Sequence, residues 1–120
     1  MKALVVDDSE VMRKVLMGAL SRAGITDVDQ AGDGNIAVEK VKSGEEYDLI
    51  LMDWYMPNMP GIEAVRAIRA SGNTIPIIMV TTEAEKSRVI EALKAGANNY
   101  IIKPFEPAAI VQKIKDTIGG

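Results

Sequence analysis

The sequence predicts an α/β fold in which five strands of a parallel sheet alternate with five helices. Short strand-like runs recur near residues 2–6, 27–31, 48–53, 75–80 and 99–102. Between them, apolar residues recur at the three- and four-residue spacing of amphipathic helices. The first, third and fourth runs show no polar alternation, which is typical of parallel strands covered by helices on both faces. We therefore expect these three strands in the centre of the sheet and the short, polar second strand at its edge.

Glycine, proline and capping residues mark where the helices begin and end. We expect the first helix to start at about Ser9 and to close at Gly24, and the third to open at Pro60. Gly96 ends the fourth helix. The apolar positions of the five helices are, in order, Met12, Val15, Leu16, Ala19, Leu20 and Ala23; Val38 and Val41; Ile62, Val65 and Ile68; Val89, Ile90, Ala92 and Leu93; and Ile110, Val111, Ile114 and Ile118. The first set forms one continuous stripe, which predicts a helix packed on the sheet along that face.

The composition excludes several classes of chemistry. The 120 residues include no histidine and no cysteine, which excludes Ser-His-Asp catalysis, histidine or thiolate zinc sites, and disulfides. Any phosphohistidine that this chain uses must therefore belong to a partner. The 14 Lys and Arg against 17 Asp and Glu give a net charge of −3 without a basic run, so we do not expect nucleic-acid binding.

The length suits one domain that needs no disulfides for stability. We expect residues 1–120 to form a single domain without linker, repeat or output domain, and to act as a monomer. No signal-peptide pattern precedes the first strand, and no apolar run approaches the length of a membrane span. We therefore expect a cytoplasmic protein with no membrane partner.

Charged side chains follow three of the predicted strands at their carboxyl ends. Asp7 and Asp8 come after the first strand, Asp53 ends the third, and Lys103 follows the fifth. The carboxyl ends of parallel strands open on one edge of the sheet, so these side chains should share a site. Neighbouring carboxylates repel one another, and a divalent cation relieves that repulsion. Because Mg²⁺ favours a few carboxylates together with waters and phosphate oxygens, the pattern predicts phosphoryl chemistry.

Each of these positions also has a purely structural explanation. One of Asp7 and Asp8 could cap the first helix, although two acids in a row exceed what a cap needs. Asp53 alone could begin a turn, and Lys103 alone could be a solvated loop residue. Thr81, at the end of the fourth strand, could be a buried hydroxyl bonded to the backbone. The combination is more specific than any single position, and Lys103 at this edge would bind a phosphate as a point charge.

Four separated motifs resemble the receiver domain of two-component response regulators, and within that family the CheY-like chemotaxis regulators. In chain order they are Asp7-Asp8, Asp53-Trp54-Tyr55-Met56-Pro57, Val80-Thr81-Thr82-Glu83 and Tyr100-Ile101-Ile102-Lys103-Pro104-Phe105. The resemblance extends over the whole chain. It implies the flavodoxin-like, doubly wound fold of that family, with strand order 2-1-3-4-5 and helices on both faces.

The resemblance implies that Asp53 is the phosphoacceptor and forms an aspartyl phosphate. Asp8 and Asp53 would bind Mg²⁺ directly, together with the backbone carbonyl of Tyr55. Asp7 would act on the metal mainly through water. In this reading the metal and a lysine neutralise the charge on the transferred phosphoryl group.

The same resemblance assigns Lys103 and Thr81 to the phosphoryl oxygens and pairs Thr81 with Tyr100 as a switch. The Thr81 hydroxyl would move toward the phosphate and leave space that the Tyr100 ring enters, so that the ring changes from exposed to buried. Without the resemblance, Tyr100 would be an ordinary aromatic of an edge strand. The predicted partner surface on the fourth helix, fifth strand and fifth helix comprises Val89, Leu93, Tyr100, Ile102 and Lys113. On amphipathicity alone, Val89 and Leu93 could equally be additional core.

Two residues next to the acceptor are less clearly assigned. Tyr55 stands where members of the family vary, and its side chain should overhang the phosphoryl site and hinder attack by water. Trp54 matches the chemotaxis regulators but could be mere local packing.

The predicted function is that of a signalling switch that catalyses only its own phosphorylation and dephosphorylation. A CheA-like histidine kinase would supply the phosphoryl group, and the phosphorylated form would bind a target such as a flagellar motor switch protein. A phosphatase is a possible further partner. A phosphorelay intermediate that passes phosphate to another histidine protein is an alternative that the sequence separates poorly.

Two rivals share part of the pattern. A haloacid-dehalogenase-like phosphatase also forms an aspartyl phosphate, but it needs a second Asp where Tyr55 stands. A flavodoxin-type electron carrier binds phosphate with hydroxyls, glycines and amides, whereas the segment Asp7-Asp8-Ser9-Glu10 would repel it.

Overall fold

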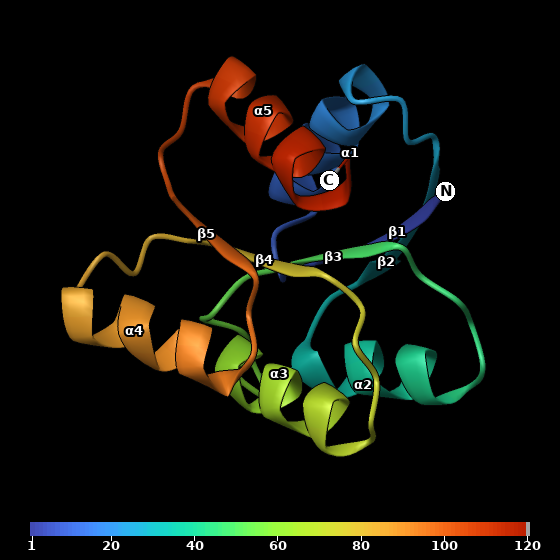
Figure 1. Cartoon of the computed structure of the whole chain (residues 1–120), viewed down its shortest axis with the longest axis vertical. Helices are drawn as coiled ribbons and strands as arrows, with labels where there is room; N and C mark the ends of the chain where they lie inside the picture. Colours follow the sequence, from blue (N-terminus) through green and yellow to red (C-terminus); the bar gives the residue numbers. More distant parts are fainter. Residues whose placement is uncertain (120) are drawn as a thin grey trace.

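A five-stranded parallel sheet lies between two layers of helices in the computed structural model, which describes residues 1–119 (Figure 1). The strands have the order β2-β1-β3-β4-β5, which confirms the predicted doubly wound fold. The elements are β1 (Lys2–Val6), α1 (Glu10–Arg22), β2 (Asp27–Ala31), α2 (Gly34–Lys42), β3 (Leu49–Met52), α3 (Gly61–Ala70), β4 (Ile77–Thr81), α4 (Lys86–Ala95), β5 (Asn99–Ile102) and α5 (Pro107–Ile118).

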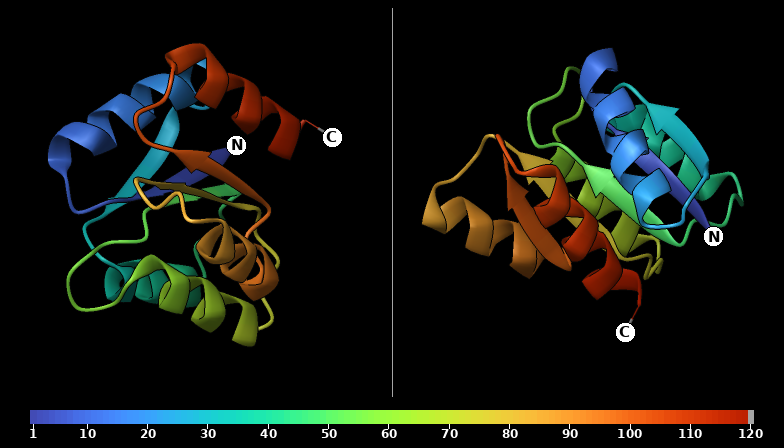
Figure 2. Two further views of the ribbon diagram at one scale, coloured as in Figure 1. Left: turned by 90° about the vertical axis from the view of Figure 1, so that its left-hand side faces the viewer. Right: turned by 90° about the horizontal axis from the view of Figure 1, so that it is seen from above.

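The sheet divides the apolar core into two halves. Helices α1 and α5 cover one face, and α2, α3 and α4 cover the other (Figure 2, left). Because successive residues of a strand point to opposite faces, Leu51 and Val80 pack with α1 and α5, whereas Ile50 and Met79 pack with the other three helices. Strands β1, β3 and β4 are buried almost throughout, and the polar β2 lies at an edge, as predicted.

The helix ends follow the predicted capping residues. The hydroxyl of Ser9 accepts a hydrogen bond from the Met12 N–H (3.2 Å) and caps α1. Pro60 directly precedes α3, and Gly96 follows α4 with a φ of 122°, a value that favours glycine. Among residues 1–119, no helix is both long enough and apolar enough to span a bilayer.

The fourth strand begins two residues later than expected. β4 begins at Ile77 rather than at residue 75, because Pro76 has no N–H for the ladder and contributes only its carbonyl, to Ile50 N (2.9 Å). It extends to Thr81, which pairs with Ile102 of β5. Thr81 is therefore a strand residue with a fixed backbone.

Two helices bury less than their apolar patterns predict. Val15 is exposed, because the buried face of α1 is formed by Leu16, Ala19 and Leu20, with Met12 and Met17 partly buried beside them. In α4, Ala92 is the only fully buried residue, and Ile90 and Leu93 are exposed. Helix α4 lies out beside the edge strand β5 in Figure 1, so little of its surface meets the sheet.

Candidate functional site at the carboxyl edge of the sheet

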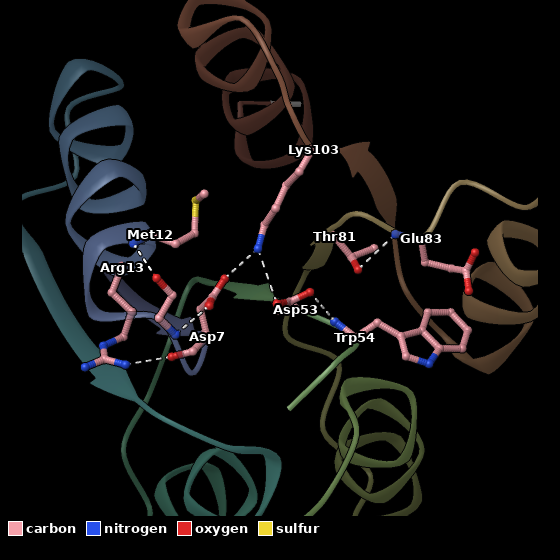
Figure 3. A network of polar contacts seen from close by, with 9 residues as sticks. Asp7, Met12, Arg13, Asp53, Trp54, Thr81, Glu83 and Lys103 are labelled. Atoms are coloured by element: carbon pink, nitrogen blue, oxygen red, sulfur yellow. Dashed lines mark hydrogen bonds and ion pairs between the residues drawn. The ribbon is translucent and has the colours of Figure 1, made fainter. Parts of the chain in front are cut away.

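Two buried carboxylates stand side by side where neighbouring strands end. Asp7 follows β1 and Asp53 follows β3, and the Asp53 N–H donates to Val6 O (2.9 Å), so the parallel pairing continues to the site. Asp7 is 1% exposed and Asp53 is 7% exposed. The two side chains converge in Figure 3, as expected for strand ends that open on the same edge.

Lys103 reaches both carboxylates from the end of β5. Its Nζ donates to Asp7 Oδ2 (2.8 Å) and to Asp53 Oδ2 (3.2 Å). Its backbone N–H donates to Thr81 O (2.8 Å), which anchors the base of the side chain on β4. The structure thus brings Lys103 and the two acids together from three separate strands.

The cluster of Asp7, Asp53 and Lys103 carries more negative than positive charge. Burial raises the pKa of Asp53, and the nearby Lys103 charge only partly offsets this effect. Burial by itself would lower the pKa of Lys103, but its contacts with Asp7 and Asp53 outweigh that effect, and its pKa is raised. One lysine therefore faces two buried acids, with Asp8 close by as a third, and an additional cation would be stabilised here.

The third acid, Asp8, is exposed and completes a set of oxygen donors. One carboxylate oxygen from each of Asp7, Asp8 and Asp53 lies within 4.8 Å of the others. Asp7 Oδ1 already accepts from the Ser9 N–H (2.9 Å), and Asp53 Oδ1 accepts from the Trp54 N–H (2.7 Å). Among the residues described, no side-chain or backbone donor bonds to the Asp8 carboxylate. Three hard oxygen donors with one free carboxylate fit a magnesium ion.

The loop that follows Asp53 is held by close backbone contacts. The Gly61 N–H donates to Trp54 O (2.8 Å), and a Cβ at Gly61 would lie only 1.8 Å from the Asp53 carbonyl oxygen. Asn58 has a positive φ of 67° and donates from its amide to Asp33 Oδ2 (2.8 Å), and Asp33 caps α2. These contacts fix the backbone that carries the Asp53 carboxylate.

Trp54 is buried rather than exposed to the site. The Arg88 guanidinium of α4 lies over its ring, 5.9 Å from the ring centroid. The sequence alone gave no reason to pair these residues, because α3, β4 and the loops around them separate the two in the chain.

Thr81 and Tyr100 are adjacent to the acids and are joined through Glu83. Thr81 is fully buried, its hydroxyl accepts from the Glu83 N–H (3.3 Å), and its closeness to Asp53 acts to lower the pKa of that carboxyl. Tyr100 is half-buried, and its hydroxyl donates to Glu83 O (2.7 Å). Burial and, after it, the negative charges of Glu83, Tyr55 and Asp53 raise the pKa of Tyr100 to about 12.

Glu83 is the residue whose importance the sequence analysis missed. The Tyr55 hydroxyl donates to its carboxylate, and this hydrogen bond, followed by one from the Glu85 N–H, holds the pKa of Glu83 below its usual range. The signal was present in the sequence: Glu83 stands two residues beyond the end of β4, at the same sheet edge as the other acids.

The predicted partner surface is only partly exposed to solvent. Leu93 and Ile102 are exposed, whereas Val89 is half-buried. Lys113 is also half-buried and donates to Asn99 Oδ1 (3.3 Å). The exposure of Leu93 excludes the alternative that it belongs to the core.

Comparison with known proteins gives consistent matches over nearly the whole chain. Residues 3–115 match the family described as response regulator receiver domain. The chain is 46% identical to chemotaxis protein CheY1 of Helicobacter pylori over 121 residues, which cover 99% of this chain and 98% of that protein.

Two solved structures match the fold closely. Chemotaxis protein CheY4 of Vibrio cholerae matches with a TM-score of 0.87 and 34% identity, covering 97% of each chain. The receiver domain of a sensor histidine kinase from Pseudomonas aeruginosa matches with a TM-score of 0.86 and 35% identity, covering 99% of this chain and 98% of that one. The latter structure has a magnesium ion coordinated in its active site cleft.

Proposed function

The chain belongs to the response regulator receiver domain family, and from this premise we propose that it is a phosphorylation-dependent switch in chemotaxis. The relatives from Helicobacter pylori and Pseudomonas aeruginosa and the structural neighbour from Vibrio cholerae are chemotaxis proteins of the CheY type, and they support the pathway assignment. The chain would take a phosphoryl group from the phosphohistidine of a CheA-like kinase onto Asp53. Its target would be a flagellar motor switch protein.

The observation that carries this proposal is the Asp53 carboxylate beside Lys103 and two further acids. In the reaction, an Asp53 oxygen attacks the phosphorus of the phosphohistidine, the P–N bond breaks, and the electron pair leaves with the imidazole of the donor. Lys103 then stabilises the negative charge on the transferred phosphoryl oxygens. Asp8, Asp53 and the backbone carbonyl of Tyr55 would hold Mg²⁺, with Asp7 acting through water. The metal supplies positive charge for the same oxygens.

The output step would use the neighbours of the acceptor. The buried Thr81 hydroxyl lies beside Asp53 and can donate to a phosphoryl oxygen, which would favour the inward position of the Tyr100 ring. This movement would change the affinity of the partner surface, which consists of Val89, Leu93, Tyr100, Ile102 and Lys113, for its target.

Phosphoryl transfer from the kinase tests the function directly. A chemotaxis-type histidine kinase of the same organism, loaded with labelled phosphate and freed of nucleotide, should transfer its label to the chain within minutes and lose it in parallel. Label that stays on the kinase would contradict the proposal. Onward movement of the label from the chain to a second histidine protein would identify a phosphorelay intermediate instead.

Thr81 and Tyr100 should behave as one coupled switch. We expect Thr81→Ala to leave phosphorylation possible but to reduce the phosphate-dependent gain in affinity for the motor switch protein. A coupling of about 1–3 kcal/mol corresponds to some 5- to 150-fold in affinity. The measurement is the dissociation constant of wild type, Thr81→Ala, Tyr100→Ala and the double variant, each with and without phosphate. Strictly additive effects on the gain would show that the two residues act independently.

A further inference from the structure

Arg13 is tied to the turn that carries two of the predicted metal ligands. It lies one turn into α1, where its backbone N–H donates to Ser9 O (2.9 Å). Side chains of a helix lean toward its N-terminus, so this long side chain reaches back over the start of α1. There its Nη1 donates to the backbone carbonyl of Asp7 (2.7 Å), and its Nε donates to Gln30 Oε1 of β2 (2.9 Å). Arg13 thus joins the turn after β1 to the edge strand.

The positive charge of Arg13 does not explain its place. The N-terminus of a helix carries partial positive charge, which disfavours a cation in the first turn. Among residues 1–119, the guanidinium makes no ion pair with Asp7, Asp8 or Asp53. In Figure 3 it lies on the side of Asp7 away from Asp53. What Arg13 contributes is therefore its two hydrogen bonds, which the rigid fork of a guanidinium can make at once.

The polar groups of Asp7 are held from several directions. Its backbone N–H donates to Ala31 O (3.1 Å), and its carboxylate accepts from the Ser9 N–H (2.9 Å) and from Lys103 Nζ (2.8 Å). Arg13 supplies the donor for the remaining group, the backbone carbonyl. Without Arg13, the other three contacts would still hold the Asp7 side chain and its N–H. The peptide that follows Asp7 would lose the contact that fixes its plane.

Asp8 has no comparable contacts of its own. It is exposed, and no donor among the described residues bonds to its carboxylate. Because a peptide is planar, the direction in which the chain enters Asp8 is set by the peptide whose carbonyl Arg13 holds. An oxygen of Asp8 lies within 4.8 Å of one from Asp7 and one from Asp53. Rotation of that peptide would carry the Asp8 carboxylate away from the other two.

We propose that Arg13 is a positioning residue of the Mg²⁺ site, which holds the Asp7 carbonyl and thereby aims the Asp8 carboxylate at the metal. The inference deepens the proposed function and rests on its Mg²⁺-dependent phosphorylation of Asp53. It assigns part of the metal affinity to a residue that is not itself a ligand. Groups that orient metal ligands in this way typically contribute about 10- to 100-fold in affinity.

The sign of the effect separates positioning from charge. If only charge mattered, removing the Arg13 guanidinium would strengthen Mg²⁺ binding, because like charges repel. If Arg13 orients Asp8, the same change weakens Mg²⁺ binding. The two explanations therefore predict opposite changes in one dissociation constant, which can be measured without any phosphoryl donor.

Calorimetric titration of the purified chain with Mg²⁺ tests the proposal. We expect Arg13→Ala to raise the dissociation constant roughly 10- to 100-fold. Gln30→Ala removes one of the two acceptors that hold the guanidinium, and it should raise the constant roughly two- to fivefold, the range of one hydrogen bond. Arg13→Ala added to Asp8→Ala should weaken binding by no more than about twofold beyond Asp8→Ala alone, because Arg13 acts through Asp8.

Two controls separate positioning from general damage to the fold. Lys14→Ala removes the neighbouring cation of α1, which is exposed and pairs with Glu10 (3.7 Å), and its dissociation constant should stay within about twofold of wild type. Urea unfolding with and without Mg²⁺ gives the second control. The metal should raise the free energy of unfolding of wild type and Lys14→Ala by more than that of Arg13→Ala, whatever the stability of each chain without metal.

The outcomes are distinguishable. Unchanged or tighter Mg²⁺ binding in Arg13→Ala, equal weakening in Lys14→Ala, or a full effect of Arg13→Ala in the Asp8→Ala chain would overturn the role of Arg13. If Arg13→Ala does not fold, Gln30→Ala decides, and an unchanged dissociation constant in that variant would overturn the proposal. A wild-type chain that binds no Mg²⁺ would overturn it as well. A wild-type chain that binds Mg²⁺ but takes up no label would contradict the proposed function alone.

Discussion

Chelation of divalent cations should stop phosphorylation, with the rate of label uptake falling roughly a hundred- to a thousandfold, the size of effect seen when one group that stabilises developing charge is removed. The physical reason lies in the charge balance of the site. Asp7 and Asp53 are buried against a single lysine, and Asp8 adds a third negative charge within 4.8 Å. An incoming phosphoryl group brings further negative charge, which Lys103 alone cannot offset.

Two variants that each remove one negative charge test whether the dependence of label uptake on Mg²⁺ comes from the predicted ligands. Asp8→Asn should raise the Mg²⁺ concentration needed for half-maximal label uptake, because it removes the carboxylate that has no other partner in the site. Glu10→Gln removes another exposed acid, from the first turn of α1, and should leave that concentration unchanged. Uptake that continues at the same rate in a chelator would contradict the magnesium assignment.

Gly61→Ala should be the most destabilising small substitution near the site. A Cβ at this position would lie 1.8 Å from the Asp53 carbonyl oxygen, a backbone atom that cannot move without displacing residue 53. We expect the free energy of unfolding to fall by about 1–3 kcal/mol or more, as for other overpacked sites. Urea unfolding measures this change, and the rate of label uptake should fall in parallel because the Asp53 backbone shifts.

Gly18→Ala is the matched control for that substitution. Gly18 lies inside α1 with no heavy atom within 4 Å of an added Cβ, so alanine should raise the unfolding free energy by up to about 1 kcal/mol through helix propensity. Equal stability changes in the two alanine variants would show that the close approach of α3 to the Asp53 backbone is not a constraint.

Much of the fold follows from patterns that are local in sequence. Uninterrupted apolar runs predicted the central strands β1, β3 and β4, and Ser9, Pro60 and Gly96 marked helix ends because caps depend on the nearest few residues. The meeting of Asp7 and Asp53 was also predictable, since it needs only parallel strands whose carboxyl ends share an edge.

The sequence-based predictions fail where tertiary packing decides which side chains are buried and which residues touch. Val15 fits the apolar stripe of α1 but lies outside the narrow face that the sheet and α5 cover. Leu93 is exposed because α4 lies beside an edge strand, which a helical pattern cannot show. The contact between Tyr55 and Glu83 joins two loops that are 28 residues apart in sequence, and no periodicity encodes such a contact.

Asp53→Asn should stay folded and can therefore serve as the control for the proposal that Asp53 is phosphorylated. Burial raises the pKa of Asp53 above its ordinary value of 3.8, which means that folding disfavours the charged carboxylate. This destabilising contribution grows as the pH rises from that value, and it is fully present above the raised pKa. A neutral amide at residue 53 should therefore leave the free energy of unfolding at pH 7 unchanged or higher, so lost phosphorylation would not reflect unfolding.

The most direct test of the account is to locate the phosphoryl group after labelling with a small acyl phosphate and Mg²⁺. Borohydride reduces an acyl phosphate to the alcohol and releases phosphate, so a phosphorylated aspartate becomes homoserine and can be identified by peptide mass spectrometry. The account predicts homoserine at residue 53 in the wild-type chain and none in Asp53→Asn. Homoserine at residue 7 or 8, or continued uptake of label by Asp53→Asn at the wild-type rate, would contradict it.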